Sequence, residues 1–185
     1  MEKKKHEIRR KYDETAEIYD QRYEKIQLQK YIEVFEKIDI TDSHIILDLG
    51  GGTGLLEQFL GVNATKIFNC DLSFRMLQIG KKKQRNSSFI LADSELLPFK
   101  EEAFETITSF SMIQNVENPS QVIKQCKEVL KNDGVMIFTA LKKKFSLEEL
   151  EEVFLKEKML IESSWPLTIE DYAIIAKKKE SSKVC

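Results

Sequence analysis

The chain has 185 residues, of which 42% are hydrophobic, so it is long and apolar enough for one globular domain and lacks the composition of a disordered chain. Its 29 Lys and Arg residues nearly balance its 31 Asp and Glu residues, which argues against the basic excess typical of nucleic-acid and membrane binders. The sequence shows no apolar run near the roughly 20 residues of a membrane span and no signal peptide. We therefore expect a cytoplasmic protein without membrane contact. The three cysteines have no metal-ligand spacing, so we predict no metal site.

Helical spacing dominates the first 40 residues. Apolar and aromatic side chains recur there at intervals of three and four, as at Ile8, Tyr12, Ala16 and Tyr19. This spacing predicts helix up to about Asp39, followed by a turn at residues 41–43.

From residue 44 onward, short apolar strands alternate with amphipathic helices. Strands are expected at residues 44–49, 66–71, 88–92, 106–110, 135–140, 159–163 and 172–176. Helices are expected at residues 55–60 and 73–83, after residues 118–120, and from Ser146. Ser73 is a predicted helix cap, and Ser146 with Glu149 forms a predicted capping box. A turn is expected at residues 132–134, and a loop that contains Trp165 and Pro166 joins the last two strands.

This alternation predicts an α/β fold with a doubly wound, mostly parallel sheet that is covered on both faces. In such sheets, ligands bind outside the carboxyl ends of the strands, where the strand order reverses. The loops after residues 49, 71, 92, 110 and 140 are therefore the places where we expect a binding site.

The loop after the first strand, residues 50–54, reads Gly-Gly-Gly-Thr-Gly. Glycine has no Cβ, so it adopts positive φ and lets a ligand approach the backbone. The lysine of a Walker-type phosphate loop is missing, and the spacing of Gly50, Gly52 and Gly54 is one residue shorter than a dinucleotide fingerprint. This shorter spacing suits a smaller anionic group, such as the carboxylate of an amino acid.

Two carboxylates follow the next two strands. Asp71 lies 21 residues after Gly50, near the offset at which an acidic residue accepts hydrogen bonds from ribose hydroxyls. Asp93 follows the third strand and is positioned to accept a bond from an adenine amino group. An amino acid, a ribose and an adenine are the parts of S-adenosylmethionine (AdoMet).

These segments also resemble the motifs of a known family. Residues 48–54, residues 71–73 with Met76, residues 92–99 and residues 130–134 are similar, in this order, to motifs of the class I AdoMet-dependent methyltransferases, in a minimal version of the ubiquinone/menaquinone-type branch. Residues 11–20 resemble the N-terminal helix that closes over the cofactor in many members. The resemblance covers nearly the whole chain and implies a Rossmann-like seven-stranded sheet in the order 3-2-1-4-5-7-6.

The resemblance also implies the domain organisation and the cofactor site. We expect residues 1–40 to form a helical lid and residues 41–180 to form the AdoMet-dependent methyltransferase domain. Asp48 fits both a structural acceptor for the loop and a place near the cofactor's ammonium group, and Tyr12 and Tyr19 fit a core position as well as cofactor contact. The predicted cofactor-binding residues are Tyr12, Tyr19, Asp48, Gly50, Gly51, Gly52, Gly54, Asp71, Leu72, Met76, Asp93, Ser94, Glu95, Phe110 and Ser111.

The methyl acceptor is less defined. The loop after the fourth strand lacks the Asn-Pro-Pro-Tyr sequence of amide and adenine methylation, and Ile113-Gln114 replaces the paired histidines common in the quinone-type branch. Gln114 is a candidate for the substrate wall. The segment between the fifth strand and the next helix is short, which suggests an open site for a macromolecule such as tRNA or protein. Lys142, Lys143 and Lys144 at its rim suit phosphate contacts.

Other readings stay open at this point. The edge strand at residues 88–91 carries few charges and could pair with a small activator protein, and the resemblance allows a zinc-binding one. A small-molecule methyltransferase and a non-catalytic AdoMet-binding module that regulates a partner are the alternatives. A nicotinamide-dependent oxidoreductase is disfavoured by the glycine spacing.

Overall fold

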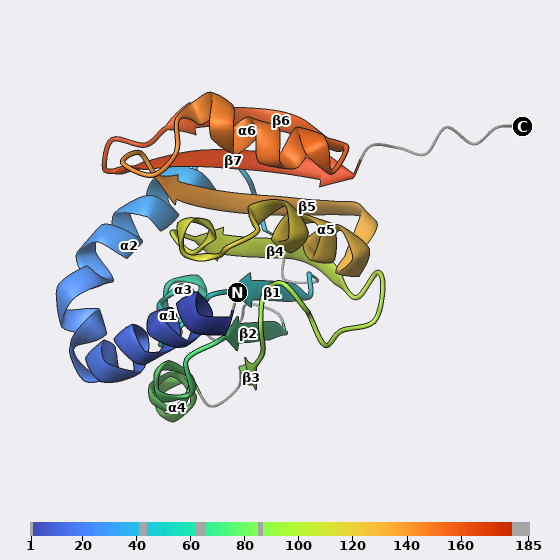
Figure 1. Ribbon diagram of the computed structural model, residues 1–185. Coiled ribbons are helices and arrows are strands. Elements are labelled where there is room, and N and C mark those ends of the chain that lie inside the picture. Colours follow the sequence, from blue (N-terminus) through green and yellow to red (C-terminus); the bar gives the residue numbers. More distant parts are fainter. Residues whose placement is uncertain (1, 41–43, 62–65, 85–86, 179–185) are drawn as a thin grey trace, which may run out of the picture.

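The computed structural model describes residues 2–40, 44–61, 66–84 and 87–178 of the chain. Seven strands form one sheet in the order β3-β2-β1-β4-β5-β7-β6 (Figure 1). Strands β1 to β5 pair in parallel, and β7 runs antiparallel to both β5 and β6. The predicted strand order and the predicted fold class are therefore confirmed. The strands are β1 (Ile46–Leu49), β2 (Ile67–Asp71), β3 (Ser88–Leu91), β4 (Phe104–Phe110), β5 (Leu130–Leu141), β6 (Met159–Pro166) and β7 (Asp171–Lys178).

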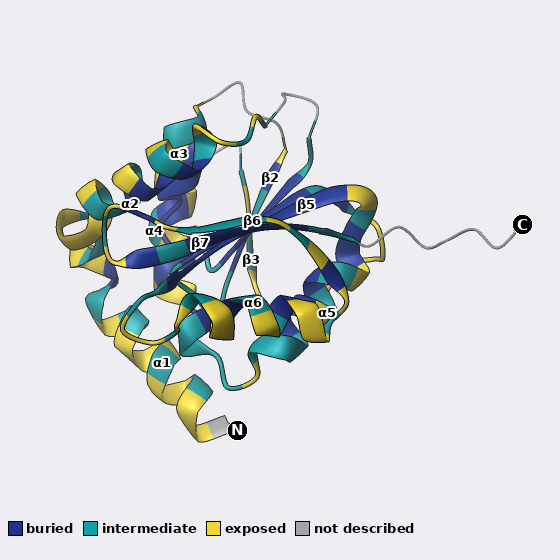
Figure 2. Ribbon diagram, turned by 90° about the horizontal axis from the view of Figure 1, so that it is seen from above, coloured by how far each residue is buried: buried dark blue, intermediate teal, exposed yellow. Residues whose placement is uncertain are grey.

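Helices cover both faces of the sheet (Figure 2). They are α1 (Glu2–Thr15), α2 (Tyr19–Phe35), α3 (Leu55–Leu60), α4 (Phe74–Lys83), α5 (Pro119–Val129) and α6 (Leu147–Lys156), with 3-10 turns η1 (Ala16–Ile18) and η2 (Ile113–Asn115). Alternate side chains of β5 serve the two faces: Met136 and Phe138 pack in a core with α5 and α6, whereas Val135 and Ile137 pack in a core with α2 and α3. This alternation is what a central strand covered on both sides requires.

The turn predicted at residues 132–134 is wrong. These residues lie within β5, where the pairing with β4 shifts register: Phe104 pairs with Leu130, and the next pair joins Thr106 to Val135. Six residues of β5 (130–135) therefore oppose three of β4 (104–106), and Asn132, Asp133 and Gly134 are accommodated as a bulge. A bulge in a strand needs the same polar and glycine residues as a free turn, which is why the two look alike in a sequence.

Two other boundaries differ from the predicted ones. Trp165 and Pro166 belong to β6 and not to a loop. Because β6 is an edge strand, a proline at its end breaks no ladder inside the sheet. The N-terminal helix ends at Phe35, earlier than Asp39, and is interrupted at Ala16–Ile18. The turn expected at residues 41–43 lies outside the described residues. The caps at Ser73 and Ser146 are confirmed: Ser73 Oγ accepts from Met76 N, and Ser146 forms a capping box with Glu149.

The two N-terminal helices cross the side of the sheet where β1, β4 and β5 end (Figure 1). Several polar contacts hold them there. Thr53 Oγ1 donates to Asp20 Oδ1 at 2.5 Å at the start of α2, and Glu33 near its end accepts from Thr168 N at 2.8 Å. Within the described residues, no helix combines the length and the apolar character that crossing a bilayer requires.

Candidate functional site

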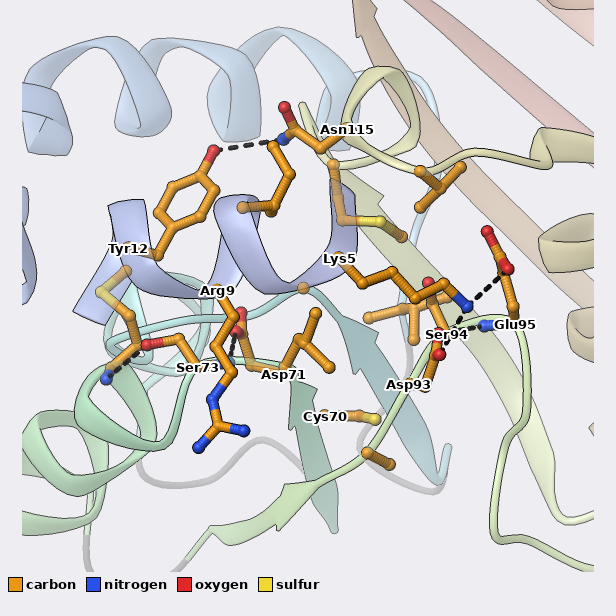
Figure 3. A pocket seen from close by; sticks show the side chains of 18 of the residues that line it. Lys5, Arg9, Tyr12, Cys70, Asp71, Ser73, Asp93, Ser94, Glu95 and Asn115 are labelled. Atoms are coloured by element: carbon orange, nitrogen blue, oxygen red, sulfur yellow. Dashed lines mark hydrogen bonds and ion pairs between the residues drawn. The ribbon is translucent and has the colours of Figure 1, made fainter. Parts of the chain in front are cut away.

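A pocket lies at the carboxyl ends of β1 to β4, under helix α1 (Figure 3). This is the place that the reversal of strand order predicts, because β1 is followed across the sheet by β2 on one side and β4 on the other. Eleven of the predicted cofactor residues line the pocket. They are Tyr12, Tyr19, Gly50, Asp71, Leu72, Met76, Asp93, Ser94, Glu95, Phe110 and Ser111.

Asp71 organises the glycine loop at the end of β2. Its Oδ2 accepts from Gly52 N at 3.1 Å, and its Oδ1 accepts from Ser73 N at 2.7 Å. Gly52 has φ +54°, a conformation in which glycine is favoured because a Cβ would be strained. Burial raises the pKa of Asp71 from 3.8 to about 6, although these N–H groups oppose the shift. Both carboxylate oxygens are thus held in place and retain lone pairs for hydroxyl donors.

Asp48 lines a smaller polar cavity beside the pocket, together with Gln27, Gly51 and Tyr31. Thr108 Oγ1 donates to Asp48 Oδ1 at 3.0 Å, and burial together with the nearby Glu57 carboxylate raises the pKa of Asp48 well above its usual range. Gln27 Oε1 is buried and has no hydrogen-bond partner within the part of the chain that the structure describes. An added Cβ on Gly51 would lie 2.4 Å from Asp48 Oδ2. This cavity has acidic and polar walls, and the backbone of Gly51 lies so close to them that no side chain fits at this position. These features suit the ammonium and carboxylate groups of an amino acid.

Asp93 is engaged by helix α1. Lys5 Nζ of α1 lies 2.6 Å from Asp93 Oδ2 and 2.6 Å from Glu95 Oε2 (Figure 3). Burial alone would lower the pKa of Lys5, but the two carboxylates outweigh it and hold the pKa above its ordinary value. Asp93 Oδ1 accepts from Glu95 N at 2.9 Å, and Glu95 also accepts from the backbone N–H groups of Glu117 and Asn118. The carboxylate predicted for adenine recognition therefore carries a cation of the protein's own N-terminal helix.

Two further hydrogen bonds attach α1 to the rest of the pocket wall. Tyr12 OH accepts from Asn115 Nδ2 at 3.1 Å, so α1 is joined to the turn after β4 (Figure 3). Asp13 Oδ1 accepts from Ser73 Oγ at 2.7 Å, which joins α1 to the start of α4. Burial raises the pKa values of both Tyr12 and Tyr19, so both phenols stay protonated donors.

Some predicted residues do not reach the pocket. Gly54 caps α3 with φ +78°, and Gly52 acts through Asp71. Gln114 Nε2 donates to the Ser111 carbonyl behind the pocket wall. Lys142 is committed elsewhere, because its Nζ donates to the carbonyls of Leu167 and Ile169 at 2.6 Å each. Lys143 and Lys144 are exposed outside the pocket.

Sequence reasoning missed several lining residues, among them Lys5, Ile8, Arg9, Met112 and Asn115. Ile8 carried a signal, since it lies in the apolar stripe of α1 with Tyr12. Met112 and Asn115 lie in the loop after residue 110, where a site was expected, but no signal singled out Lys5 or Arg9. Cys70 also lines the pocket, as a free thiol whose pKa burial raises to about 12. The thiol therefore remains protonated and unreactive.

Fold and pocket together define the class. A doubly wound sheet carries, at its switch point, carboxylates on successive strands and a polar amino-acid cavity, which fits a nucleoside joined to an amino acid. The chain matches the family model described as "Methyltransferase domain" over residues 47–138. It belongs to the class I AdoMet-dependent methyltransferase family, whose cofactor is AdoMet.

Individual relatives agree with this family. The chain is 35% identical over 136 residues to an uncharacterized protein of Methanocaldococcus jannaschii, with 71% of this chain and 51% of that protein covered. It is 28% identical to the demethylmenaquinone methyltransferase of Streptomyces griseus, with 74% and 61% covered. The chain thus spans only about half to three-fifths of the length of these curated relatives.

Solved structures share the fold. A structure of the Haloferax volcanii Trm112 methyltransferase activator with a methyltransferase aligns with a TM-score of 0.84 at 14% identity, covering 94% of this chain and 98% of that chain. A SAM-dependent methyltransferase of Aquifex aeolicus aligns with a TM-score of 0.77 at 14% identity, covering 89% and 97%. At such identities, the likeness concerns the fold alone.

Proposed function

We propose that this protein transfers the methyl group of AdoMet to an acceptor that binds next to the end of β4. The observation that carries this proposal is the row of carboxylates along the strand ends: Asp48 near the end of β1 lines the smaller polar cavity, Asp71 ends β2, and Asp93 follows β3. In this row, Asp93 serves the adenine, Asp71 the ribose and Asp48 the ammonium group. AdoMet, when bound, supplies an electrophilic methyl group on a good leaving group, so the protein chiefly supplies position and alignment.

We further propose that the acceptor is a macromolecule, with tRNA or protein as the classes. Only residues 142–146 separate β5 from α6, so no long segment lies there to cover a small substrate. The exposed Lys143 and Lys144 in this connection suit phosphate or acidic partners. We exclude Lys142 from the residues proposed for acceptor binding, because its ammonium group donates hydrogen bonds to two backbone carbonyls.

The test is a labelling experiment with methyl-labelled AdoMet and separate fractions of undermethylated tRNA, ribosomal protein and small metabolites from the source cells. Label in RNA or protein supports the proposal, and a double Lys143→Glu/Lys144→Glu variant should then lower the labelling while AdoMet still binds. Label in a small metabolite would overturn the macromolecular acceptor. Binding of AdoMet without any labelling would favour a regulatory binding module, and preference for a nicotinamide cofactor would overturn the family-based function. Asp71→Ala is the matched variant that should lose AdoMet.

A small activator protein is the partner that the edge of the sheet suits best. β3 is an edge strand of four residues, and the nearby Leu91 and Leu96 are 51% and 75% exposed. Exposed apolar side chains beside an unpaired strand edge are typical of strand addition. The Trm112 activator solved with the Haloferax methyltransferase is a protein of the kind that we propose for this role.

The free edge can be blocked without breaking the sheet. Ala92 N donates to Asp71 O, so the neighbouring Leu91 N–H points away from β2 because successive groups alternate along a strand. Leu91→Pro should therefore abolish binding of an activator from the same organism while the affinity for S-adenosylhomocysteine stays unchanged. Leu91→Ala is the control that keeps the N–H group. An unaltered complex with Leu91→Pro would contradict strand addition at β3.

A further inference from the structure

Behind the pocket wall lies a buried polar cluster of three residues from three elements. Lys30 of α2 and Asp171 at the start of β7 form an ion pair with 3.0 Å between Nζ and Oδ1, and their side chains are 3% and 0% exposed. Both also contact Ser111, which follows β4 and lines the pocket. Lys30 Nζ donates to Ser111 Oγ at 2.5 Å, and Ser111 Oγ donates to Asp171 Oδ2 at 2.6 Å.

The hydrogen bonds of the Ser111 hydroxyl determine whether it can donate to a ligand in the pocket or only accept from it. A hydroxyl has one proton and two lone pairs. Its proton goes to Asp171 and one lone pair accepts from Lys30, so the remaining lone pair is what the hydroxyl presents to a ligand. The group therefore accepts a hydrogen bond and does not donate one. The neighbouring carboxylate polarises the O–H bond and strengthens this acceptor.

The backbone holds Ser111 in this position at a cost. Its φ is +54°, a left-handed conformation that is strained for a non-glycine residue. Ser111 N donates to both Thr139 Oγ1 and Thr139 O, at 3.0 and 3.2 Å, which fixes the conformation from β5. A strained backbone conformation of this kind is kept only where neighbouring residues hold it in place.

Ser111 also lies where the reacting centre of a bound cofactor is expected. In AdoMet the sulfur joins the ribose to the amino acid, so with the ribose at Asp71 and the amino acid at Asp48 it lies near the end of β1. β4 is the next strand, and the two loops are in contact, since a Cβ on Gly50 would lie 2.5 Å from Met112 Cγ. Ser111 is thus next to the expected position of the methyl group and of the atom that receives it.

We propose that Ser111, positioned by Lys30 and Asp171, accepts a hydrogen bond from the N–H or O–H group of the atom that becomes methylated. The proposal rests on the proposed function and narrows its substrate class to protic nucleophiles. Lys30 balances the buried charge of Asp171, since an isolated carboxylate at this depth would be costly. Lys30 and Asp171 are positioning residues, because neither lines the pocket.

The test uses sinefungin, an analogue of AdoMet with an amino group in place of the S-methyl group. This amino group stands where AdoMet carries the transferred methyl group, so it presents N–H donors to any hydrogen-bond acceptor that lies beside the methyl position. The wild-type protein should bind sinefungin more tightly than S-adenosylhomocysteine, as measured by calorimetry. Because a hydrogen bond to a charged group is strong, Ser111→Ala should reduce this preference by roughly 10-fold or more. Ser111→Gly, which also relieves the strained φ, should reduce it equally.

The matched control is Ser109→Ala. Ser109 precedes Ser111 by two residues on β4, is fully buried, and has a hydroxyl without a hydrogen-bond partner among the described residues. Its removal should leave the sinefungin preference unchanged. A double Lys30→Met/Asp171→Asn variant removes both charges without leaving either one unpaired, and it should lower the preference partway.

The outcomes separate the two proposals. If neither ligand binds the wild-type protein, the proposed function fails. If both bind and the preference is absent or survives in Ser111→Ala and Ser111→Gly, the role of Ser111 is wrong while the function stands. If Ser111→Ala abolishes the preference but the double variant keeps it fully, the positioning role of Lys30 and Asp171 is wrong.

Discussion

We expect the protonation of Asp71 to change both the free energy of unfolding and the affinity for the cofactor. Its pKa rises from 3.8 to about 6, because burial penalises the charged carboxylate more than the Ser73 and Gly52 N–H groups stabilise it. At about 1.4 kcal/mol per pH unit, this shift corresponds to at most about 3 kcal/mol, and water in the pocket reduces it because Asp71 is only partly buried. A raised pKa in the folded state stabilises the fold at low pH. This contribution is complete below about pH 3.8 and is lost as the pH rises through about 6.

Ligand binding should have the opposite pH dependence. The ionised Asp71 accepts hydrogen bonds from ribose hydroxyls, so the affinity for S-adenosylhomocysteine should fall below about pH 6, approaching 10-fold per pH unit. The raised pKa of Asp48 acts in the same direction. Calorimetric titrations between about pH 5 and 8, with urea unfolding of the ligand-free protein at the same pH values, measure both effects. Asp71→Asn should flatten the Asp71 part of both profiles. A wild-type dissociation constant that stays constant from about pH 7 to 5 would refute the reasoning.

Three other predictions concern the loop, the lid and a distant cap. Gly51→Ala should lower the free energy of unfolding by about 1–3 kcal/mol in urea, because its Cβ would lie 2.4 Å from Asn69 Nδ2 and Asp48 Oδ2, which are buried; an unchanged value would mean that the loop can shift. Lys5→Ala should speed the association of S-adenosylhomocysteine in stopped-flow measurements, because it frees Asp93 and Glu95, and slower association would contradict this role of Lys5. Ser146→Ala should cost about 1 kcal/mol of stability through the lost cap without changing ligand affinity, since Ser146 is remote from the pocket.

The features that the sequence predicts are those that repeat locally. Apolar runs, caps and the glycine loop identify most strands, the helix starts and Asp71, because each signal lies within a few residues of the element that it describes. The strand order was implied by the resemblance to class I methyltransferases. The bulge at residues 132–134 escaped because it depends on the register of β4 against β5. Lys5 and Lys30 escaped for a related reason. Both are lysines in charged helices, and their carboxylate partners Asp93 and Asp171 lie far away in the sequence.

The charges of the pocket suggest a reason for the lysine, Lys5, on helix α1. Asp71, Asp93 and Glu95 line one pocket, and the buried Asp48 of β1 and Glu57 of α3 flank the glycine loop, so the ligand-free site gathers five carboxylates. Lys5 neutralises part of this charge when α1 is closed. AdoMet has a net positive charge, whereas the product S-adenosylhomocysteine has lost the sulfonium charge. An acidic site of low dielectric therefore binds the cofactor more tightly than the product. The same carboxylates destabilise the ligand-free fold when they are ionised, and they lower the affinity for the product relative to the cofactor.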